Sequence, residues 1–515
     1  MNRLTLWLDN PILVKHARSR LRAMQLFPAV AVVMILALCV VLIGYQFDRL
    51  RGGGTFGGLM ALQSIILGIM GAAQVGTSVG KARDSGILDF HRVAPMRPLA
   101  VTLGFFFGAP IREYLLFAAT LPFSLICVAA GRPSPQGFFQ LMVPLLLAAW
   151  VLHAVALLNA LSWQGRRNAT RGVIGLVLFI FFGSGSMFSG FSVAATAVDE
   201  TPTLGFYWWR LPWLLVLAFD LLPAIGFLLT ASARKMASDR AHALSKPQAV
   251  ACLATGEFLL VGGLWDIEWF GYWALVVLYA TMILAISLSV TITPNLGEYT
   301  KGVRQAIKEG RSHPSAWSDR GLNRPAVVGL CLLTLVGPTV AWRAIEEPAT
   351  WASQRGPVSY SLSIAIGVIV VAYVGLAMQY FQIRFGKRGP IFMALFLFAA
   401  WLLPFLVGTI AMSRPGTGSG PGVVGPVLMS LCPLVGIALS SGAATEIPQQ
   451  AAQAAALLPA LGFAFLFNNL VVKARRRIDG EINPAIPGPT PDPLFDAEPG
   501  PATQPLAVAD VLEMS

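Results

Sequence analysis

Apolar stretches of about 16–25 residues recur along the chain from Phe27 to Val472, and few charged residues interrupt them. An α-helix rises about 1.5 Å per residue and the hydrocarbon core of a bilayer is about 30 Å thick, so about 20 apolar residues cross it. The pattern therefore predicts an all-α, polytopic integral membrane protein. Composition agrees, because only 12% of the residues are charged, whereas a soluble domain carries about 25%.

Six spanning helices are expected in the first half of the chain, where residues 27–235 form a membrane bundle. The expected spans are 27–45, 56–79, 103–130, 138–161, 172–194 and 211–232. Loops rich in Lys and Arg alternate with loops that hold few of them. Because Lys and Arg accumulate on cytoplasmic loops, both ends of this half are expected inside the cell.

The second half, residues 236–480, is expected to add about six helices. The segment 249–264 is short for a span, but the strongly basic loop 294–325 lies inside only if this segment crosses the membrane. The other expected spans are 270–293, 326–342, 358–379, 390–412 and 454–472.

Residues 422–442 are also apolar, but one more crossing would place the basic run 473–477 outside the cell. This segment contains Pro426, Pro433 and several glycines, which favour a re-entrant hairpin on the outer face. The chain is thus expected to have about twelve spanning helices and two cytoplasmic termini.

The two ends of the chain differ from the membrane part. Residues 1–26 predict an amphipathic cytoplasmic segment, because Asn10 is a suitable N-cap and Pro11 a suitable first-turn residue of a helix. The basic side of that helix holds Lys15, Arg18, Arg20 and Arg22. Such a helix lies flat at the lipid headgroups. Residues 481–515 contain no Lys or Arg and many prolines and acids, which predicts a disordered cytoplasmic tail.

The net charge of +12 and the pI near 9.8 do not indicate nucleic acid as a partner. Cytoplasmic loops and anionic lipid headgroups account for the basic residues. The five cysteines all lie inside apolar stretches without a CxxC spacing, so neither disulfides nor a metal site is expected. The partners expected from composition are membrane lipids.

The first inside loop, residues 80–98, follows the second span and combines acids with a Pro-bounded turn. It reads Arg83-Asp84-Ser85-Gly86-Ile87-Leu88-Asp89, and Pro95 follows. Charge alone is also consistent with an ordinary solvated loop. The nearby string from Gly76 to Lys81 is not a phosphate-binding loop, because its Gly spacing is wrong and no Ser or Thr follows the Lys.

Together with Asn10-Pro11-Ile12-Leu13-Val14-Lys15, this loop resembles the permease subunits of ABC transporters of the second export type. In that family an elbow helix of the form N-P-I/V-L-x-K/R-E-x-K/R precedes the first span, and the loop after the second span reads E-R-E-x-G-T-L-E-x-L-x-x-x-P. This chain departs from the pattern: His16-Ala17 stands where the elbow has Glu, Ala82 and Ile87 replace an acid and a Thr, and the loop acids are Asp.

The resemblance implies a permease subunit of an ABC-type exporter in the cell (inner) membrane. The implied ATPase-coupling residues are Arg83, Asp84, Gly86, Leu88, Asp89 and Pro95, and the implied elbow residues are Asn10, Pro11, Lys15, Arg18 and Arg22. ATP and Mg belong to a separate ABC ATPase subunit, and this chain is neither an enzyme nor a cofactor carrier. The permease is either one chain with two halves, or a homodimer or a pair with a second permease.

A few polar residues inside the apolar stretches support other functions. Arg112 and Glu113 are candidates for a gate or substrate path, although adjacent residues point about 100° apart on a helix and are not ideal partners for each other. Asp220 is the most interior carboxylate and a third candidate. An ion-coupled secondary transporter that uses Asp220 and Glu257 is the alternative, and a membrane enzyme or scaffold is a further one.

Overall fold

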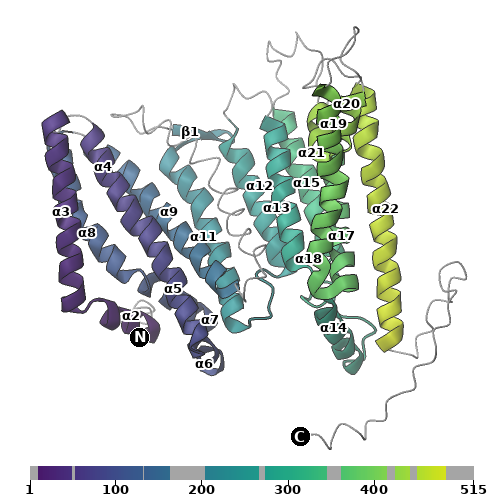
Figure 1. Cartoon of the computed structure of the whole chain (residues 1–515), viewed down its shortest axis with the longest axis horizontal. Coiled ribbons are helices and arrows are strands. Elements are labelled where there is room, and N and C mark those ends of the chain that lie inside the picture. The colour runs from purple at the N-terminus through teal and green to yellow at the C-terminus, as the bar shows by residue number, and fades with distance from the viewer. Residues whose placement is uncertain are drawn as a thin grey trace, which may run out of the picture.

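The computed structural model describes residues 10–48, 53–131, 133–162, 203–265, 273–344, 361–413, 424–440 and 449–482. In these ranges the chain is an all-α polytopic membrane protein, in which long helices stand side by side in a row (Figure 1). Ten of its helical segments are long and apolar enough to cross a membrane. The expected span 172–194 lies outside the described residues, so the full number of spans stays a prediction.

The first half begins with a short helix and continues with long apolar ones. The elements are α2 (Pro11–Arg20), α3 (Ala23–Asp48), α4 (Gly53–Ser64), the π-helical turn η1 (Ile65–Met70), α5 (Gly71–Asp84), α6 (Ile87–Val93), α7 (Pro98–Gly108), α8 (Ile111–Ala129), α9 (Pro135–Ser162) and α11 (Trp213–Ala237). The helix α2 begins at the expected place, where the Asn10 side chain accepts a hydrogen bond from the Ile12 amide.

The expected single span 103–130 is in fact two helices, α7 and α8. Helix α7 ends at Gly108, and Pro110 occupies the N-cap position of α8. Proline has no amide hydrogen to donate and its ring clashes with the carbonyl four residues earlier, so an α-helix does not pass through it undisturbed. Pro110 thus lies at the break between α7 and α8, whereas Pro122 lies inside α8 without ending it.

A two-stranded antiparallel hairpin precedes α11 at the upper edge of Figure 1 and contacts the second half. Its strands are β1 (Thr203–Phe206) and β2 (Trp209–Pro212). Tyr207 in the turn has a φ of 54°, and its hydroxyl donates a hydrogen bond to the Phe258 carbonyl at 2.7 Å. This bond fixes the hairpin to the first helix of the second half.

The second half contains α12 (Lys246–Gly263), α13 (Trp273–Ile292), α14 (Leu296–Lys308), α15 (Arg324–Ala344), α17 (Ser361–Phe385), the 3-10 turn η2 (Gly386–Arg388), α18 (Gly389–Leu397), the π-helical turn η3 (Phe398–Leu402), α19 (Leu403–Ser413), α20 (Val424–Ser430), α21 (Pro433–Ser440) and α22 (Gln449–Ile482). The short segment 249–264 forms α12, which a capping box of Ser245 and Gln248 starts three residues earlier than expected. It is not among the ten candidate spans.

Two segments of the second half differ from long spans. The basic region 294–325, expected as a loop, contains the helix α14, which Asn295 and Glu298 start through a capping box. Residues 424–440 form two short helices, α20 and α21, of 7 and 8 residues. Neither is long enough to cross a bilayer, and the re-entrant hairpin on an outer face stays a prediction. The expected disordered tail 481–515 lies, apart from Glu481 and Ile482 at the end of α22, outside the described residues.

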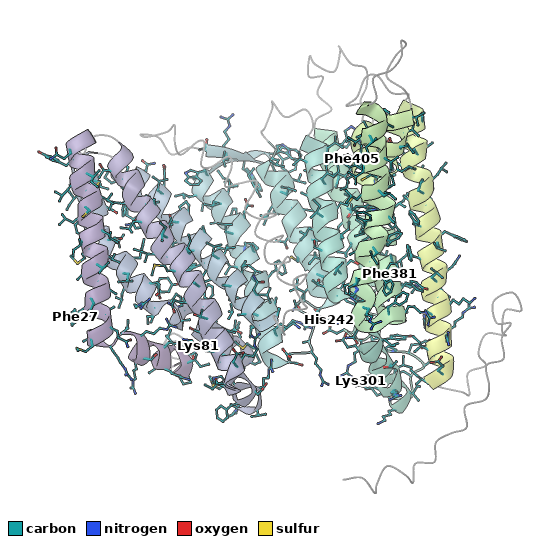
Figure 2. The ribbon with its side chains drawn as sticks, viewed as in Figure 1. Phe27, Lys81, His242, Lys301, Phe381 and Phe405 are labelled. Carbon is teal, nitrogen blue, oxygen red and sulfur yellow. The ribbon has the colours of Figure 1, made fainter. Side chains whose placement is uncertain are left out.

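Each half packs around one central helix. In the first half α9 lies against α5 and α11, and in the second half α17 lies against α13, α15 and α22. The outer helices keep large apolar side chains exposed, as a protein surrounded by lipid does: Ile35 and Ile43 of α3 are each 59% exposed. The helices α2, α6 and α14 lie along one edge, the lower edge of Figure 1, where Figure 2 also places Lys81 and Lys301.

Candidate functional site

The helix α6 projects from the lower edge because the chain turns sharply at Gly86. Helix α5 ends at Asp84, and Gly86 has a φ of +72° and forms the N-cap of α6. Glycine adopts this left-handed conformation without steric cost, whereas a side chain is strained there. The turn therefore lets a short helix follow α5 and change its direction at the end of the membrane segment (Figure 1).

Carboxylates and apolar groups are exposed together at the end of α5 and on α6. The side chains of Asp84 and Asp89 are each 75% exposed. Phe90 is 67% and Val93 82% exposed, whereas Leu88 is 3% exposed and anchors the helix in the core. Apolar side chains that lie together in water beside charges are a common mark of a surface that binds another protein.

The base of α6 is fixed to two long helices. Arg92 donates to Asp89 Oδ1 at 2.7 Å and to the Met236 carbonyl at 3.3 Å, and its Nη2 lies 3.4 Å from Asp239 Oδ1. Arg83 Nη1 donates to the Ala160 carbonyl at the end of α9 at 3.0 Å. Arg92 therefore connects α6 to the end of α11, and Arg83 connects the end of α5 to α9.

The six residues expected to couple to an ATPase therefore have different positions. Arg83 and Leu88 face inward, Gly86 forms the turn, and Asp84 and Asp89 are exposed. Pro95 is exposed in the short connection between α6 and α7. Sequence reasoning missed Phe90 and Val93 on the exposed face, and Arg92 at the base. Phe90 and Val93 follow Leu88 by two and five residues, so in a short helix they lie on a different side from Leu88. This spacing was the signal that could have identified them.

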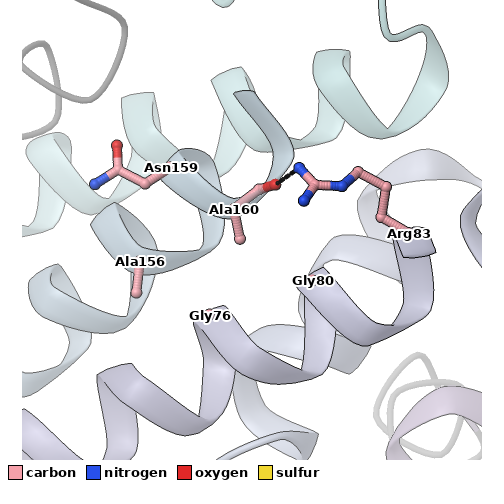
Figure 3. A pocket seen from close by; sticks show the side chains of 6 residues that line it. All are labelled: Gly76, Gly80, Arg83, Ala156, Asn159 and Ala160. Atoms are coloured by element: carbon pink, nitrogen blue, oxygen red, sulfur yellow. Dashed lines mark hydrogen bonds between the residues drawn. The ribbon is translucent and has the colours of Figure 1, made fainter. Parts of the chain in front are cut away.

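A groove of about 390 Å³ lies between α5 and α9 beside this loop. Its lining residues are Gly76, Gly80, Arg83, Ala156, Asn159 and Ala160. Figure 3 shows Arg83 crossing from α5 to the Ala160 carbonyl at one end of the groove, and small residues along the rest. A Cβ atom at Gly76 or Gly80 would meet no atom within 4 Å, so the two helices are not in close contact at these positions.

The helix α2, which the sequence predicts as an elbow, is held tightly against α7. Asn10 Nδ2 donates to the Ala100 carbonyl at 2.7 Å. Ile12 is 3% exposed, and a Cβ atom at Gly104 would lie 2.7 Å from the Cβ of Ile12. Glycine at 104 therefore permits a close approach between α2 and α7 that any larger residue would prevent. The exposed residues of α2 include Pro11, Lys15, Arg18 and Ser19, and Arg22 just after it is also exposed.

Arg20 and His16 join α2 to the rest of the first half. Arg20 donates to Gln74 Oε1 at 2.5 Å and to Ser78 Oγ at 2.7 Å, both on α5. The His16 ring lies edge-on to Phe105 of α7, with centroids 5.4 Å apart. Burial, and then the positive charges of Arg20 and Lys15, lower the pKa of His16 to about 4, so the elbow packs with a neutral imidazole at pH 7.

Arg112 and Glu113 pair with each other, contrary to the expectation from their adjacent positions. Arg112 Nε and Nη2 donate to Glu113 Oε1 at 3.1 and 2.8 Å. Glu113 is fully buried, so its carboxylate is not at a wet interface. The Arg side chain is long enough to fold back around the helix, and a buried carboxylate needs a cation for compensation, which explains why the pair forms. Arg20 of the elbow also lies within electrostatic reach of Glu113.

His153 connects the second, third and fourth expected spans inside the first half. Its Nε2 lies 2.8 Å from the Leu67 carbonyl in η1, and its Nδ1 lies 3.3 Å from the Tyr114 hydroxyl. Because a carbonyl only accepts, Nε2 carries the hydrogen and Nδ1 accepts from Tyr114. The π-helical turn η1 interrupts the regular backbone hydrogen bonds of the α-helix, and His153 donates a hydrogen bond to the Leu67 carbonyl at that point.

Asp220 and Glu257 lie apart from the Arg112–Glu113 pair. Asp220 is 5% exposed on α11, which packs on α9 and α7, whereas Arg112 and Glu113 are on α8, which packs on α3 and α4. Glu257 is 4% exposed on α12, and a Cβ atom at Gly337 of α15 would lie 2.8 Å from its carboxyl carbon. The three expected gate residues therefore do not form one cluster, and Glu257 occupies a separate site in the second half.

Within the described ranges, no group of three or more His, Cys, Asp or Glu side chains is arranged to hold a metal ion. Comparisons of the whole chain with models of known protein families, with curated proteins and with solved structures found no match.

Proposed function

We propose that the chain is the transmembrane permease subunit of an ABC-type exporter and that a separate ATPase subunit docks on α6. The observation that supports the proposal is the form of this helix and the turn before it: α6 has an exposed face with Asp89, Phe90 and Val93 and is fixed at its base by Arg92, and the end of α5 has the exposed Asp84 and is fixed by Arg83. Exposed apolar side chains that lie together beside charges are typical of a surface that binds another protein.

The proposed mechanism is mechanical. ATP-driven closure of the partner moves α6, and the Arg92 and Arg83 contacts pass this movement to α11 and α9. Helix α5 moves directly, because it ends one turn before α6. The elbow follows α5 through Arg20 and α7 through Asn10, so the helices of the first half shift together. In this proposal the lower edge is cytoplasmic, in the cell membrane, and ATP and Mg are bound by the partner.

A double charge reversal tests the proposal. Asp84→Lys with Asp89→Lys changes only exposed side chains, so the bundle is expected to fold while export that depends on ATP is lost. The matched control is Asp84→Asn with Asp89→Asn, which removes the charges without reversing them and is expected to retain part of the activity. Normal export by the reversed variant would refute the proposed coupling.

Glu257 supports a second candidate function, an ion-coupled carrier. Its Oε1 atom makes no hydrogen bond of normal geometry among the described residues, and the hydroxyl that interacts with the carboxyl group is that of Thr281 on the neighbouring helix α13. A buried carboxyl in this state binds a proton or a cation in many carriers. If Glu257→Gln or Asp220→Asn abolishes transport while the Asp84→Lys, Asp89→Lys variant transports normally, the ion-coupled carrier replaces the exporter.

A further inference from the structure

The two halves of the chain share one packing plan, although their sequences show no convincing repeat. In chain order the expected spans of the first half are α3, α4–α5, α7–α8, α9, a fifth outside the described residues, and α11, and those of the second half are α12, α13, α15, α17, α18–α19 and α22. In both halves the first span packs on the second and third, the second on the third and fourth, the third on the fourth, and the fourth on the sixth. Among these described spans, the third packs extensively on the sixth in the first half alone.

The connection between the second and third spans also corresponds in the two halves. In the first half it carries α6 and in the second half α14, and both helices lie at the lower edge of Figure 1. Each helix is bonded to the end of the last span of its own half. Arg92 of α6 reaches the Met236 carbonyl and Asp239 at the end of α11, and Tyr299 of α14 donates to Asp479 Oδ1 of α22 at 2.9 Å.

From this correspondence we infer that the chain is a tandem pair of six-helix units and that α14 is a second docking helix for an ATPase domain. The inference rests on the proposed function, because α14 is assigned its partner through its equivalence to α6. One chain then supplies both halves of the permease, and a homodimer is not needed to complete it.

The surface of α14 defines the kind of partner that fits it. Tyr299 and Val303 are each 1% exposed and hold the helix against α22 and α17. The opposite face is exposed and contains Lys301, Arg304, Ile307 and Lys308. This face combines three positive charges with one apolar side chain, so the receiving surface of the ATPase domain is acidic around a small apolar contact.

The environment of α14 keeps this face directed away from the membrane bundle. Lys246 donates to the Ala316, Gly321 and Leu322 carbonyls at 2.9, 2.7 and 3.1 Å, and Arg234 pairs with Asp319. These bonds hold the segment after α14 against the ends of α11 and α12. Because the connection from α13 to α14 is only three residues long, α14 stays close to the end of its second span, as α6 does.

Photo-crosslinking tests the inference on the full chain in its native membrane. A photoreactive phenylalanine analogue replaces Ile307 on α14, Phe90 on α6, or Trp209 at the opposite edge as a control. The expected result is a product with a P-loop ATPase chain from both Ile307 and Phe90, none from Trp209, and one permease chain with two ATPase domains by native mass measurement. The α14 product is expected to fall more steeply with salt than the α6 product, because its contacts are charged.

The outcomes separate the two proposals. Absence of an ATPase at Phe90 contradicts the proposed function itself. An ATPase at Phe90 with only lipid or the chain's own residues 483–515 at Ile307 overturns the inference about α14 and leaves the proposed function standing. The variant Lys301→Glu, Arg304→Glu, Lys308→Glu is expected to remove one of the two ATPase domains, and an unchanged stoichiometry of two would also overturn the inference.

Discussion

Arg92 and Asp239 connect the exposed helix α6 to the end of the last span in the first half, with Arg92 Nη2 lying 3.4 Å from Asp239 Oδ1. The same guanidinium holds Asp89 and the Met236 carbonyl. One side chain thus joins the surface that we propose as the docking site to the last long helix of the first half.

Replacing this side chain is expected to loosen α6 without unfolding the protein. In Arg92→Ala the side chain loses its contacts with Asp89, Asp239 and the Lys235 and Met236 carbonyls, each partly exposed and worth about 0.2–1 kcal/mol. Hydrogen exchange in residues 87–93 is expected to accelerate, and ATP-driven transport is expected to fall more than partner binding. Arg477→Ala removes another exposed pair, with Glu481, and is the control. Equal exchange rates in Arg92→Ala and the unmodified protein would show that the Arg92 contacts do not hold α6 in place.

The apolar tip of α6 is expected to contribute directly to partner binding. Burying a large apolar side chain contributes about 1.5–3 kcal/mol, so Phe90→Ser with Val93→Ser is expected to weaken ATPase binding by about 10-fold or more. Binding can be measured with the purified permease and its partner in detergent. Phe139→Ser changes a comparable side chain, 62% exposed on α9, and is expected to leave the affinity unchanged. An affinity equally unaffected by the tip variant would contradict the docking surface.

Gly71 beside His153 is expected to tolerate no side chain. A Cβ atom there would lie 2.3 Å from His153 Nε2, so Gly71→Ala must displace the imidazole from the Leu67 carbonyl. Overpacking of this kind costs about 1–3 kcal/mol. Gly76→Ala, one and a half turns later in the same helix, meets no atom within 4 Å and is the matched control. Thermal unfolding in detergent is expected to occur at a lower temperature for Gly71→Ala only, and identical melting temperatures for the two variants would rule out this packing.

The elbow is expected to become less stable in acid because His16 is buried in the neutral form. Its pKa in the folded protein is lowered to about 4 from the ordinary 6.5. The unfolded elbow therefore binds a proton more readily, and stability falls as the pH drops from about 6.5 towards 4. Protease cleavage within residues 10–22 is expected to increase over this range in the unmodified protein and to change less in His16→Phe. A pH dependence that persists unchanged in His16→Phe would assign it to another group.

The membrane architecture could be predicted from the sequence because it depends on hydropathy averaged over long segments. In the part of the chain that the structure describes, ten apolar segments form helices of spanning length, since lipid leaves a backbone no alternative to internal hydrogen bonds. Local signals also sufficed at Asn10, which caps α2 where expected. Pro110 was compatible with a break but did not require one, because α8 and α9 continue through Pro122 and Pro144, and hydropathy averaged over the whole stretch did not show the break.

The contacts of the candidate site could not be predicted in the same way, because they depend on neighbours far away in the sequence. Arg92 finds Asp239 and Arg20 finds Gln74 only when the helices are assembled. Arg112 pairs with Glu113 against the expectation from helix geometry, because burial of the carboxylate makes a cation necessary. The helix α14 was not predicted, because the high charge of its region indicated a loop. Its capping box at Asn295 could have been recognised in the sequence.

The most direct test of the central claim is affinity purification of the full chain from its native membrane, followed by identification of stoichiometric partners. The account predicts a soluble subunit with a Walker-type phosphate loop that co-purifies with the chain and is lost in the Asp84→Lys, Asp89→Lys variant. A partner-free preparation that transports under an ion gradient alone would contradict it.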